Sequence, residues 1–225
     1  MTPIDTAETV PAGVTEKVST ATAGLVPAYM HEVYDWAYLN PRNANLLDRD
    51  VIVSLILWGN NQRLKQALMT EITPYATVLQ AAHVYGALIP EIAAKLKNPS
   101  HLEVIEVSPL QANICREKLQ AFPQAEVRLG DAATMRTRPA DAVCCFFLLH
   151  EIPGSYKRMV VNNLLDHVAP GGKAIFVDYH KPVGFHPLKG LMNLIWRKFE
   201  AFAVELVETE IKALAEDDAY FTSSK

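Results

Sequence analysis

Between residues 78 and 178, short apolar runs alternate with longer stretches in which apolar residues recur every three or four positions. The short runs are typical of β-strands, and the longer stretches of amphipathic helices. Ala142 to Leu149 contains no polar side chain, which indicates a parallel strand buried on both faces. The pattern predicts an α/β fold with a doubly wound, mostly parallel sheet. The expected strands are 78–82, 102–107, 125–129, 141–147 and 173–178, and the expected helices are 87–97, 109–120 and 154–168.

Residues 25–77 precede this alternation and predict an N-terminal helical cap. Apolar and aromatic residues from Tyr29 to Tyr38 fall at helical spacing, and Asn40-Pro41 is expected to stop that helix. Its tyrosine stripe is interpreted either as a covering helix on the core or as a lid that lines a pocket for a flat ring. Two further segments complete the cap, the very apolar 50–58 and the amphipathic helix 62–72.

The two ends of the chain lack the alternation. Residues 1–24 are rich in Thr, Ala and Val without a sustained period, and we expect a mobile leader. The core is expected to span 78–203 and to close with an amphipathic helix, 188–203, whose large apolar groups lie beside cations. That helix either packs on the cap, contacts a membrane in its plane or forms the apolar wall of a pocket. Residues 204–225 are expected to be an acidic tail, either abbreviated or leaving a sheet edge open.

Composition narrows the function classes. The 225 residues are 50% hydrophobic and 20% charged with a formal charge of −4, so we expect one large domain and no nucleic-acid partner. Three cysteines cannot pair completely, and two are adjacent in an apolar run, which indicates reduced thiols in a cytosolic protein. No apolar run approaches the roughly 20 residues that cross a bilayer, and no signal-peptide pattern is present.

The loop after the first expected strand is the first candidate site. The chain passes from Val78 to Ala82 through a small-residue turn to Gly86 and an expected helix, so backbone N–H groups would face a ligand. Twenty residues further, Glu106 ends the second expected strand, where a carboxylate would hold both hydroxyls of a ribose. Only Gly86 remains of the three glycines usual in such a loop. The pair therefore indicates either a nucleoside site or an ordinary strand-to-helix turn.

Polar residues also follow the later strands, whose carboxyl ends meet at one edge of a parallel sheet. Asp131 follows a strand and a glycine, which suits either contact with an adenine edge or a plain turn. His150-Glu151 and Asp178-Tyr179-His180 would place two imidazoles and two carboxylates near one pocket. They are interpreted as acids, bases or loosely held metal ligands, or else as caps and backbone partners. No spacing matches a structural zinc site.

Five segments in this order are similar to the ordered motifs of class I S-adenosylmethionine (SAM)-dependent methyltransferases. The resemblance covers roughly residues 60 to 180 and implies a Rossmann-like fold that binds SAM. The segments are Val78 to Gly86, Val104 to Leu110, Gly130 to Ala132, Phe146 to Pro153 and Ala169 to Gly172.

Within that superfamily, the chain resembles the RquA family, the methyltransferase-like proteins of rhodoquinone biosynthesis, over about 150 residues. The family implies a transferase that replaces a methoxy group of ubiquinone by an amino group. SAM would supply the nitrogen, and a divalent metal, manganese by preference, would assist. We expect a cytoplasmic protein, peripheral on the cytoplasmic face of the inner membrane, and assembly into a homo-oligomer stays open. The segments that carry the likeness are Tyr34 to Pro41, Ile56 to Asn60, Val78 to Gly86, Phe147 to Pro153 and Asp178 to His180.

Gln80 departs from the methyltransferase pattern, in which an acid at this place helps to anchor the ammonium of SAM. An uncharged Gln80 beside bulky His83, Val84 and Tyr85 is expected to let that nitrogen shift toward the quinone. It would also leave the amine neutral, as attack requires. The expected chemistry is conjugate addition of the SAM nitrogen at the methoxy-bearing carbon, loss of methanol, and later release of the nitrogen from its carbon skeleton. A metal or a His or Tyr donor on the quinone oxygen would help.

Position then assigns roles to single residues. The catalytic candidates are His150, Tyr179, His180 and Asp178, and the candidate metal ligands are Glu151 and Asp178. The quinone is expected to contact Tyr34, Tyr38, Leu148 and Trp196. SAM is expected to contact Gln80, Ala81, Ala82, His83, Tyr85, Gly86, Glu106, Val107, Ser108, Asp131, Ala132 and Phe147.

Two other functions suit the same residues. One is an ordinary methyltransferase that acts on a quinone or another lipid, which methyl label in the product would reveal. The other is a SAM-fold protein that binds without catalysis, for which the reduced glycine loop is the best support. Turnover by the purified protein would exclude the second.

Overall fold

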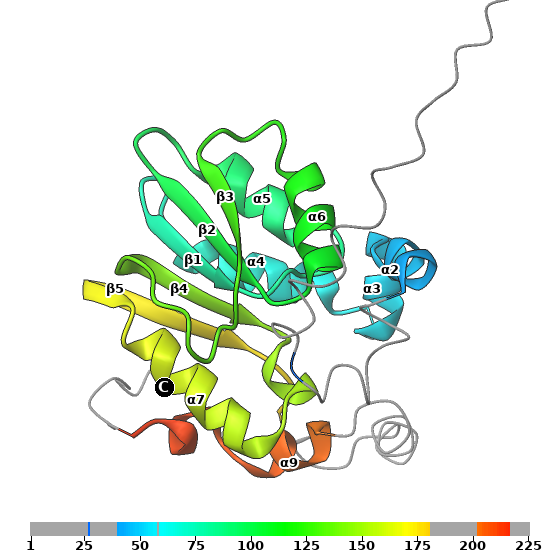
Figure 1. The fold of residues 1–225 in the computed structure, drawn as a ribbon, viewed down its shortest axis with the longest axis vertical. Coiled ribbons are helices and arrows are strands. Elements are labelled where there is room, and N and C mark those ends of the chain that lie inside the picture. Colours follow the sequence, from blue (N-terminus) through cyan, green and yellow to red (C-terminus); the bar gives the residue numbers. More distant parts are fainter. Residues whose placement is uncertain (1–26, 28–39, 58, 181–201, 217–225) are drawn as a thin grey trace, which may run out of the picture.

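The computed structural model describes residues 27, 40–57, 59–180 and 202–216 (Figure 1). Within these residues, five parallel strands form one sheet in the order β3-β2-β1-β4-β5. This confirms the predicted doubly wound α/β fold, and the bounds of β1 to β4 are close to the expected ones. The strands are β1 (Thr77–Ala81), β2 (His101–Glu106), β3 (Ala125–Leu129), β4 (Ala140–Phe146) and β5 (Val168–Val177).

Helices cover both faces of the sheet. One face packs against α4 (Asn61–Glu71), α5 (Leu88–Lys95) and α6 (Pro109–Lys118), and the other against α7 (Gly154–Leu165) and α9 (Ala203–Glu208) (Figure 1). The short 3₁₀ helix η3 (Ile211–Leu214) packs on the same side as α7. Two small helices, α2 (Pro41–Leu47) and α3 (Asp50–Ile56), lie beside the carboxyl ends of the strands (Figure 1).

The two halves of the core follow from the alternation of side chains along each strand. Val78 and Val104 point to the side of α5, where they are 2% and 0% exposed. Leu79 and Ile105, one position along, point to the side of α7 and are each 1% exposed. A strand buried on both faces needs apolar residues at successive positions. This explains why apolar and polar residues do not alternate along β1 and β4.

The chain reverses its winding between β1 and β4, which are neighbours in the sheet although β2 and β3 intervene in sequence. At such a switch point the loops after the two strands diverge to opposite faces and leave a crevice at the carboxyl edge. The loop after β1 and the 3₁₀ helix η2 (Leu149–Glu151) after β4 therefore flank the place where a ligand is expected.

Three local expectations require correction. Asn40-Pro41 begins a helix: the Asn40 side chain accepts a hydrogen bond from the Arg42 amide at 3.1 Å, and Pro41 occupies the first turn of α2. Strand β5 starts at Val168, before the Pro170-Gly171-Gly172 turn, because an irregularity in its pairing with β4 absorbs that turn. The expected acidic tail, 204–225, contains most of α9 and all of η3.

The expected tyrosine-striped helix and the leader lie outside the described residues, as does most of the expected helix 188–203. Within the described chain, no helix is both long and apolar enough to cross a membrane.

Candidate functional site at the carboxyl edge of the sheet

The loop after β1 turns sharply at both ends. Ala82 has φ 63° and Gly86 has φ 83°, a region that side chains disfavour, so the loop is held by its contacts. Ala82 N donates to Ile105 O at 2.8 Å, and His83 N donates to Glu106 Oε2 at 2.7 Å. The loop is therefore fastened along the end of β2, as the candidate cofactor site requires.

Glu106 lies under this loop, 5% exposed. Its second oxygen, Oε1, accepts a hydrogen bond from Ser108 N at 2.7 Å, so the carboxylate joins the loop to the start of α6. Burial raises the Glu106 pKa to about 7, although the backbone N–H groups of His83, Ser108 and Val107 oppose the rise. The structure thus shows a positioning role, and contact with a ribose stays a prediction.

Gln80 is the second-last residue of β1, and it is fully buried. Its Nε2 donates to Ala81 O at 2.6 Å and to Ala82 O at 3.3 Å, which fixes the amide orientation. Its Oε1 has no hydrogen-bond partner among the residues that the structure describes. A buried acceptor without a donor costs free energy, so this oxygen suits a ligand N–H or O–H group.

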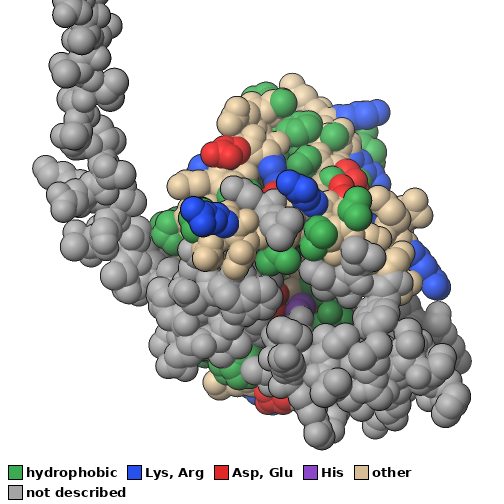
Figure 2. Space-filling view, turned by 90° about the vertical axis from the view of Figure 1, so that its right-hand side faces the viewer, with side chains coloured by type: hydrophobic (Ala, Val, Ile, Leu, Met, Phe, Trp, Pro, Cys, Tyr) green, Lys and Arg blue, Asp and Glu red, His purple; other side chains and the backbone are tan. Residues whose placement is uncertain are grey.

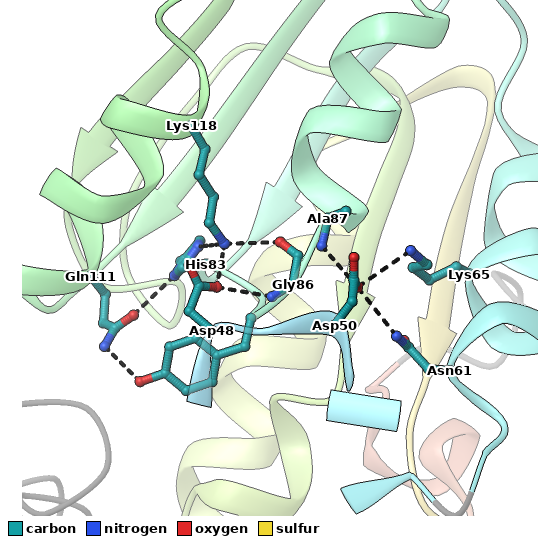
Figure 3. A network of polar contacts seen from close by, with 10 residues as sticks. Asp48, Asp50, Asn61, Lys65, His83, Gly86, Ala87, Gln111 and Lys118 are labelled. Carbon is teal, nitrogen blue, oxygen red and sulfur yellow. Dashed lines mark hydrogen bonds and ion pairs between the residues drawn. The ribbon is translucent and has the colours of Figure 1, made fainter. Parts of the chain in front are cut away.

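A chain of polar contacts runs beside the loop (Figure 3). Lys118 Nζ lies 3.1 Å from His83 Nε2, His83 Nδ1 lies 2.9 Å from Gln111 Oε1, and Gln111 Nε2 donates to the Tyr85 hydroxyl at 2.9 Å. Burial, and next the Lys118 charge, lower the His83 pKa to about 4. His83 is therefore neutral at pH 7, with Nε2 accepting from Lys118 and Nδ1–H donating to Gln111.

Two aspartates near the junction of α2 and α3 complete this network, and sequence reasoning did not find them. Asp48 Oδ1 accepts from Gly86 N at 2.9 Å and pairs with Lys118 Nζ. Asp50 Oδ1 accepts from Ala87 N at 3.2 Å and lies 3.7 Å from Lys65 Nζ. One feature of the sequence could have indicated them. The N-cap of α5 is Ala87, whose side chain cannot accept a hydrogen bond, so the first backbone N–H groups of α5 need acceptors from another part of the chain.

His150 and Asp178 meet across the ends of β4 and β5. His150 Nδ1 lies 2.8 Å from Asp178 Oδ1, while the other oxygen, Oδ2, accepts from Leu149 N at 2.8 Å and His150 N at 3.3 Å. The His150 residue is 4% exposed, and the Asp178 side chain 1%. A carboxylate can only accept, so Nδ1 carries the proton and Nε2 is the basic nitrogen.

Aromatic rings surround this histidine. The ring centroid of Tyr179 lies 4.7 Å from that of His150, and the Phe147 centroid lies 5.7 Å from it. Phe147 has φ 52°, a strained value for a bulky residue, and its amide donates to Val177 O at 2.7 Å. Tyr179 N donates to Asp178 Oδ1 at 2.8 Å. The structure therefore brings together three of the four predicted catalytic residues, and His180 lies next to them in sequence.

Asp131 holds its own turn and a neighbouring helix. Its Oδ1 accepts from Ala133 N at 2.8 Å, and its Oδ2 accepts from the Tyr156 hydroxyl at 3.0 Å. Burial and the Asp131 charge raise the Tyr156 pKa. The structure shows the turn that one interpretation of the sequence expects, and it places Asp131 after β3 at the carboxyl edge. Its contact with an adenine stays a prediction.

The predicted metal ligands do not form a metal site here. The described residues contain no group of three or more His, Cys, Asp or Glu side chains placed to hold an ion. Asp178 already accepts hydrogen bonds from one imidazole and three backbone amides, and Glu151 Oε1 lies 3.7 Å from His150 Nε2. These residues do not fit a divalent ion as they stand.

Tyr85 belongs to the loop after β1, and burial raises its pKa. The hydrogen bond from Gln111 opposes the rise, and the charges of Glu151, Asp48 and Glu106 add to it. Figure 2 shows the side of the molecule that carries the loops after β1 and β4, with a histidine side chain at the bottom of a hollow. Of the predicted quinone contacts, Leu148 is half-buried at this edge, and Tyr34, Tyr38 and Trp196 lie outside the described residues.

Comparison with known proteins agrees with this geometry. Residues 78–172 match a family model described as a methyltransferase domain. The thiopurine S-methyltransferase of Photobacterium profundum is 25% identical over 133 residues, which are 58% of this chain and 61% of that protein. The mitomycin 7-O-methyltransferase MmcR superposes with a TM-score of 0.55 at 16% identity, covering 72% of this chain and 46% of MmcR.

The chain has the class I SAM-dependent methyltransferase fold. The N-methyltransferase NodS from Bradyrhizobium japonicum WM9 shares this fold, with a TM-score of 0.50 at 15% identity over 66% of this chain and 80% of NodS. Within a class I methyltransferase fold, the β1 loop, Glu106 and Gln80 occupy the edge at which nucleoside ligands bind. The chain spans 61% of the length of the thiopurine S-methyltransferase, so the fold is shared and the activity is argued below.

Proposed function

We propose that the chain binds SAM across the carboxyl ends of β1 and β2. The support is the methyltransferase-domain match over 78–172 together with the winding reversal between β1 and β4. The residues at this edge suit the ligand. Glu106 at the end of β2 offers carboxylate oxygens to ribose hydroxyls, and Gln80 at the end of β1 offers an acceptor without a described donor to an N–H group.

We further propose that the bound SAM serves as amino donor to ubiquinone and yields rhodoquinone. When bound, SAM would supply two groups for transfer, the methyl on its sulfur and the nitrogen of its methionine part. Gln80 is the observation that carries the choice of nitrogen. Its Oε1 is fully buried and lacks a described donor, so it can accept from a neutral amine, whereas a carboxylate there would hold the amine as ammonium.

His150 is the proposed base and acid of the reaction. Asp178 accepts hydrogen bonds from Nδ1–H of His150 and from the backbone amides of Leu149 and His150, and these contacts fix the imidazole. Nε2 is then the nitrogen that takes a proton from the attacking amine. Glu151 Oε1, 3.7 Å from Nε2, stabilises the imidazolium that results. The protonated ring can then return the proton to the departing methoxy oxygen, which leaves as methanol. The nitrogen is then still bonded to the Cα of the SAM skeleton. Loss of the Cα proton with transfer of two electrons into the quinone ring, followed by hydrolysis, would release the amino group as rhodoquinol, the reduced form of rhodoquinone, together with a 2-oxo acid.

The aromatic rings of Tyr179 and Phe147 pack against the His150 imidazole. Their ring centroids lie 5.2 Å apart and both face His150, so a flat quinone ring brought to Nε2 would meet aromatic edges. We propose that the quinone approaches from the membrane surface and that the protein is peripheral there. A divalent metal is implied by the family resemblance alone, since the described residues offer no group of ligands that fits one.

Methyl transfer is the second candidate, favoured by the methyltransferase-domain match. His150 would then deprotonate an acceptor hydroxyl or thiol, and the methionine part of SAM would stay anchored. The geometry of His150 and Asp178 serves both reactions, so the two candidates differ at Gln80 alone.

Doubly labelled SAM separates the two candidates. The purified protein is incubated with ubiquinone and SAM that carries 15N in its amino group and 13C in its methyl group, and the quinone product is analysed by mass spectrometry. Amination places 15N in the product without 13C and releases methanol from the ring. Appearance of 13C in the product would support methyl transfer and contradict amination. A quinone unchanged by enzyme that binds SAM would contradict both.

A further inference from the structure

The start of α5 is already occupied by two carboxylates of the same chain (Figure 3). Gly86 N donates to Asp48 Oδ1 at 2.9 Å, and Ala87 N donates to Asp50 Oδ1 at 3.2 Å. Backbone N–H groups at the start of a helix are natural donors to an anion, and the helix dipole favours negative charge there. Asp48 and Asp50 thus take the place that the carboxylate of an amino acid ligand could occupy.

Packing at Gly86 shows how close the second aspartate comes. A Cβ built on Gly86 would lie 2.6 Å from Asp50 Oδ1, well inside contact distance. A side chain at this position would displace the Asp50 carboxylate, and the φ of 83° at Gly86 favours glycine independently. In a cofactor loop, a glycine commonly allows close approach of the ligand. Here the group that approaches is Asp50.

The two neighbouring lysines already form ion pairs with acidic side chains of the same chain. Lys118 Nζ pairs with Asp48, donates to Gly86 O at 2.9 Å and lies 3.1 Å from His83 Nε2. On the other side, Lys65 Nζ donates to Glu91 Oε1 at 2.6 Å and lies 3.7 Å from Asp50. A ligand carboxylate that arrived at the start of α5 would meet two like charges, Asp48 and Asp50, and cations that are already paired.

Gln80 provides a second and independent observation. Its fully buried Oε1 is an acceptor without a described donor, so this end of the site is built for N–H or O–H groups. The acceptor at Gln80 and the carboxylates of Asp48 and Asp50 all suit a hydrogen-bond donor. They therefore favour the amine of the SAM methionine part and disfavour its carboxylate.

We propose that Asp48 and Asp50 determine the specificity of the site by excluding a ligand carboxylate from the start of α5. SAM is then held through its nucleoside and its amine, and its carboxylate contributes little to affinity. This inference rests on the proposed binding of SAM, and it adds that the site recognises the amine of the methionine part and not its carboxylate.

Calorimetry with two ligands tests the inference on the full chain. Dissociation constants are measured for SAM and for decarboxylated SAM, which keeps the amine and lacks the carboxylate. The wild-type protein is expected to bind the two within about threefold of each other, because the carboxylate makes no charge-assisted hydrogen bond at the start of α5. A loss of about thirtyfold or more on decarboxylation would overturn the inference while SAM binding itself stood.

Asp50→Ala tests the same point from the side of the protein. It frees Ala87 N and removes one charge, so SAM should bind about tenfold more tightly relative to decarboxylated SAM. Asp141→Ala is the matched control, because Asp141 also accepts from a backbone amide, Thr77 N at 2.7 Å, but at the opposite edge of the sheet. It should leave the ratio unchanged.

An unchanged ratio of the two dissociation constants in Asp50→Ala, with folding checked by circular dichroism, contradicts the role given to Asp50. If Asp50→Ala does not fold, Asp50→Asn replaces it, since the amide keeps an acceptor and loses the charge, and a smaller shift in the same direction is expected. Failure of wild type to bind either ligand would remove the proposed function and this inference together.

Discussion

The imidazole of His150 is fixed by Asp178, whose two oxygens contact the ring Nδ1 at 2.8 Å and the Leu149 amide at 2.8 Å. This pairing sets the tautomer and leaves Nε2, 3.7 Å from Glu151 Oε1, as the basic nitrogen. His150 is the proposed base, and an imidazole fixed in this way needs no rearrangement before it accepts a proton, so the proposed chemistry depends on it most.

Replacement of the base should separate catalysis from folding. His150→Gln is expected to lower kcat by about 100-fold or more while the KM for SAM changes little. His167→Gln is the matched control: His167 is also buried, but it bonds Thr137 N and Asn163 O at the amino ends of β4 and β5. The control should lower stability and keep kcat. Equal kcat in folded His150→Gln and wild type would exclude His150 as the base.

Gln80→Glu should change which group of SAM is transferred. The added charge is buried against Ala81 O and Ala82 O, so the free protein is expected to lose roughly 2 to 3 kcal/mol of unfolding free energy. The same charge would anchor the SAM ammonium and suppress transfer of nitrogen. The labelled-SAM assay should therefore show less 15N in the product, with Gln80→Leu as the uncharged control of similar size. Wild-type 15N transfer by Gln80→Glu would contradict the role of this residue.

Glu106 makes stability depend on pH. Its pKa is about 7 in the folded protein against an ordinary 4.5, so the folded state keeps a proton that the unfolded chain has lost between these values. The contribution of Glu106 is fully present below about pH 4.5 and is lost as pH rises through about 7. Relative to wild type, Glu106→Gln should gain on the order of 2 to 3 kcal/mol between pH 4.5 and pH 8. Urea unfolding at both pH values measures the difference, and a constant difference would contradict the assignment.

Lys157 should stabilise the loop that carries the base. Its Nζ, on a side chain 2% exposed, donates to Ile152 O at 2.6 Å and Phe202 O at 3.2 Å and lies 3.4 Å from Glu205 Oε2. Lys157→Met strands two carbonyl oxygens, so a loss of about 2 to 3 kcal/mol is expected in urea unfolding. Lys173→Met, which breaks an exposed pair with Glu71, is the control and should leave the urea midpoint unchanged. Equal midpoints for the two variants would remove the role of Lys157.

The sequence was sufficient for the sheet because buried strands and amphipathic helices have different periods. The loops after β1, β2 and β4 were located for the same reason, since each follows an apolar run. The partner of His150 was not predictable in this way. It depends on the register that pairs Phe146 with Val177, which brings the residues that follow, Phe147 and Asp178, to the same level. Register between strands distant in sequence is set by tertiary packing.

The contribution of the cap was missed for a different reason. Asp48 and Asp50 lie between two short helices, and no local pattern relates them to Gly86, some 38 and 36 residues away. The Asn40-Pro41 pair was seen as a stop signal, although an Asn cap followed by proline is equally typical of a helix start. Correct assignment of α2 would have placed both aspartates near a helix end, but their contact with α5 required the structure.

A crystal structure of the full chain with SAM tests the central claim most directly. The account predicts the ribose hydroxyls at Glu106 and the amine within hydrogen-bond distance of Gln80 Oε1, on the side of the ligand that faces His150. A nucleoside bound away from Glu106, or a methionine part with its methyl toward His150 and its amine held elsewhere, would contradict it.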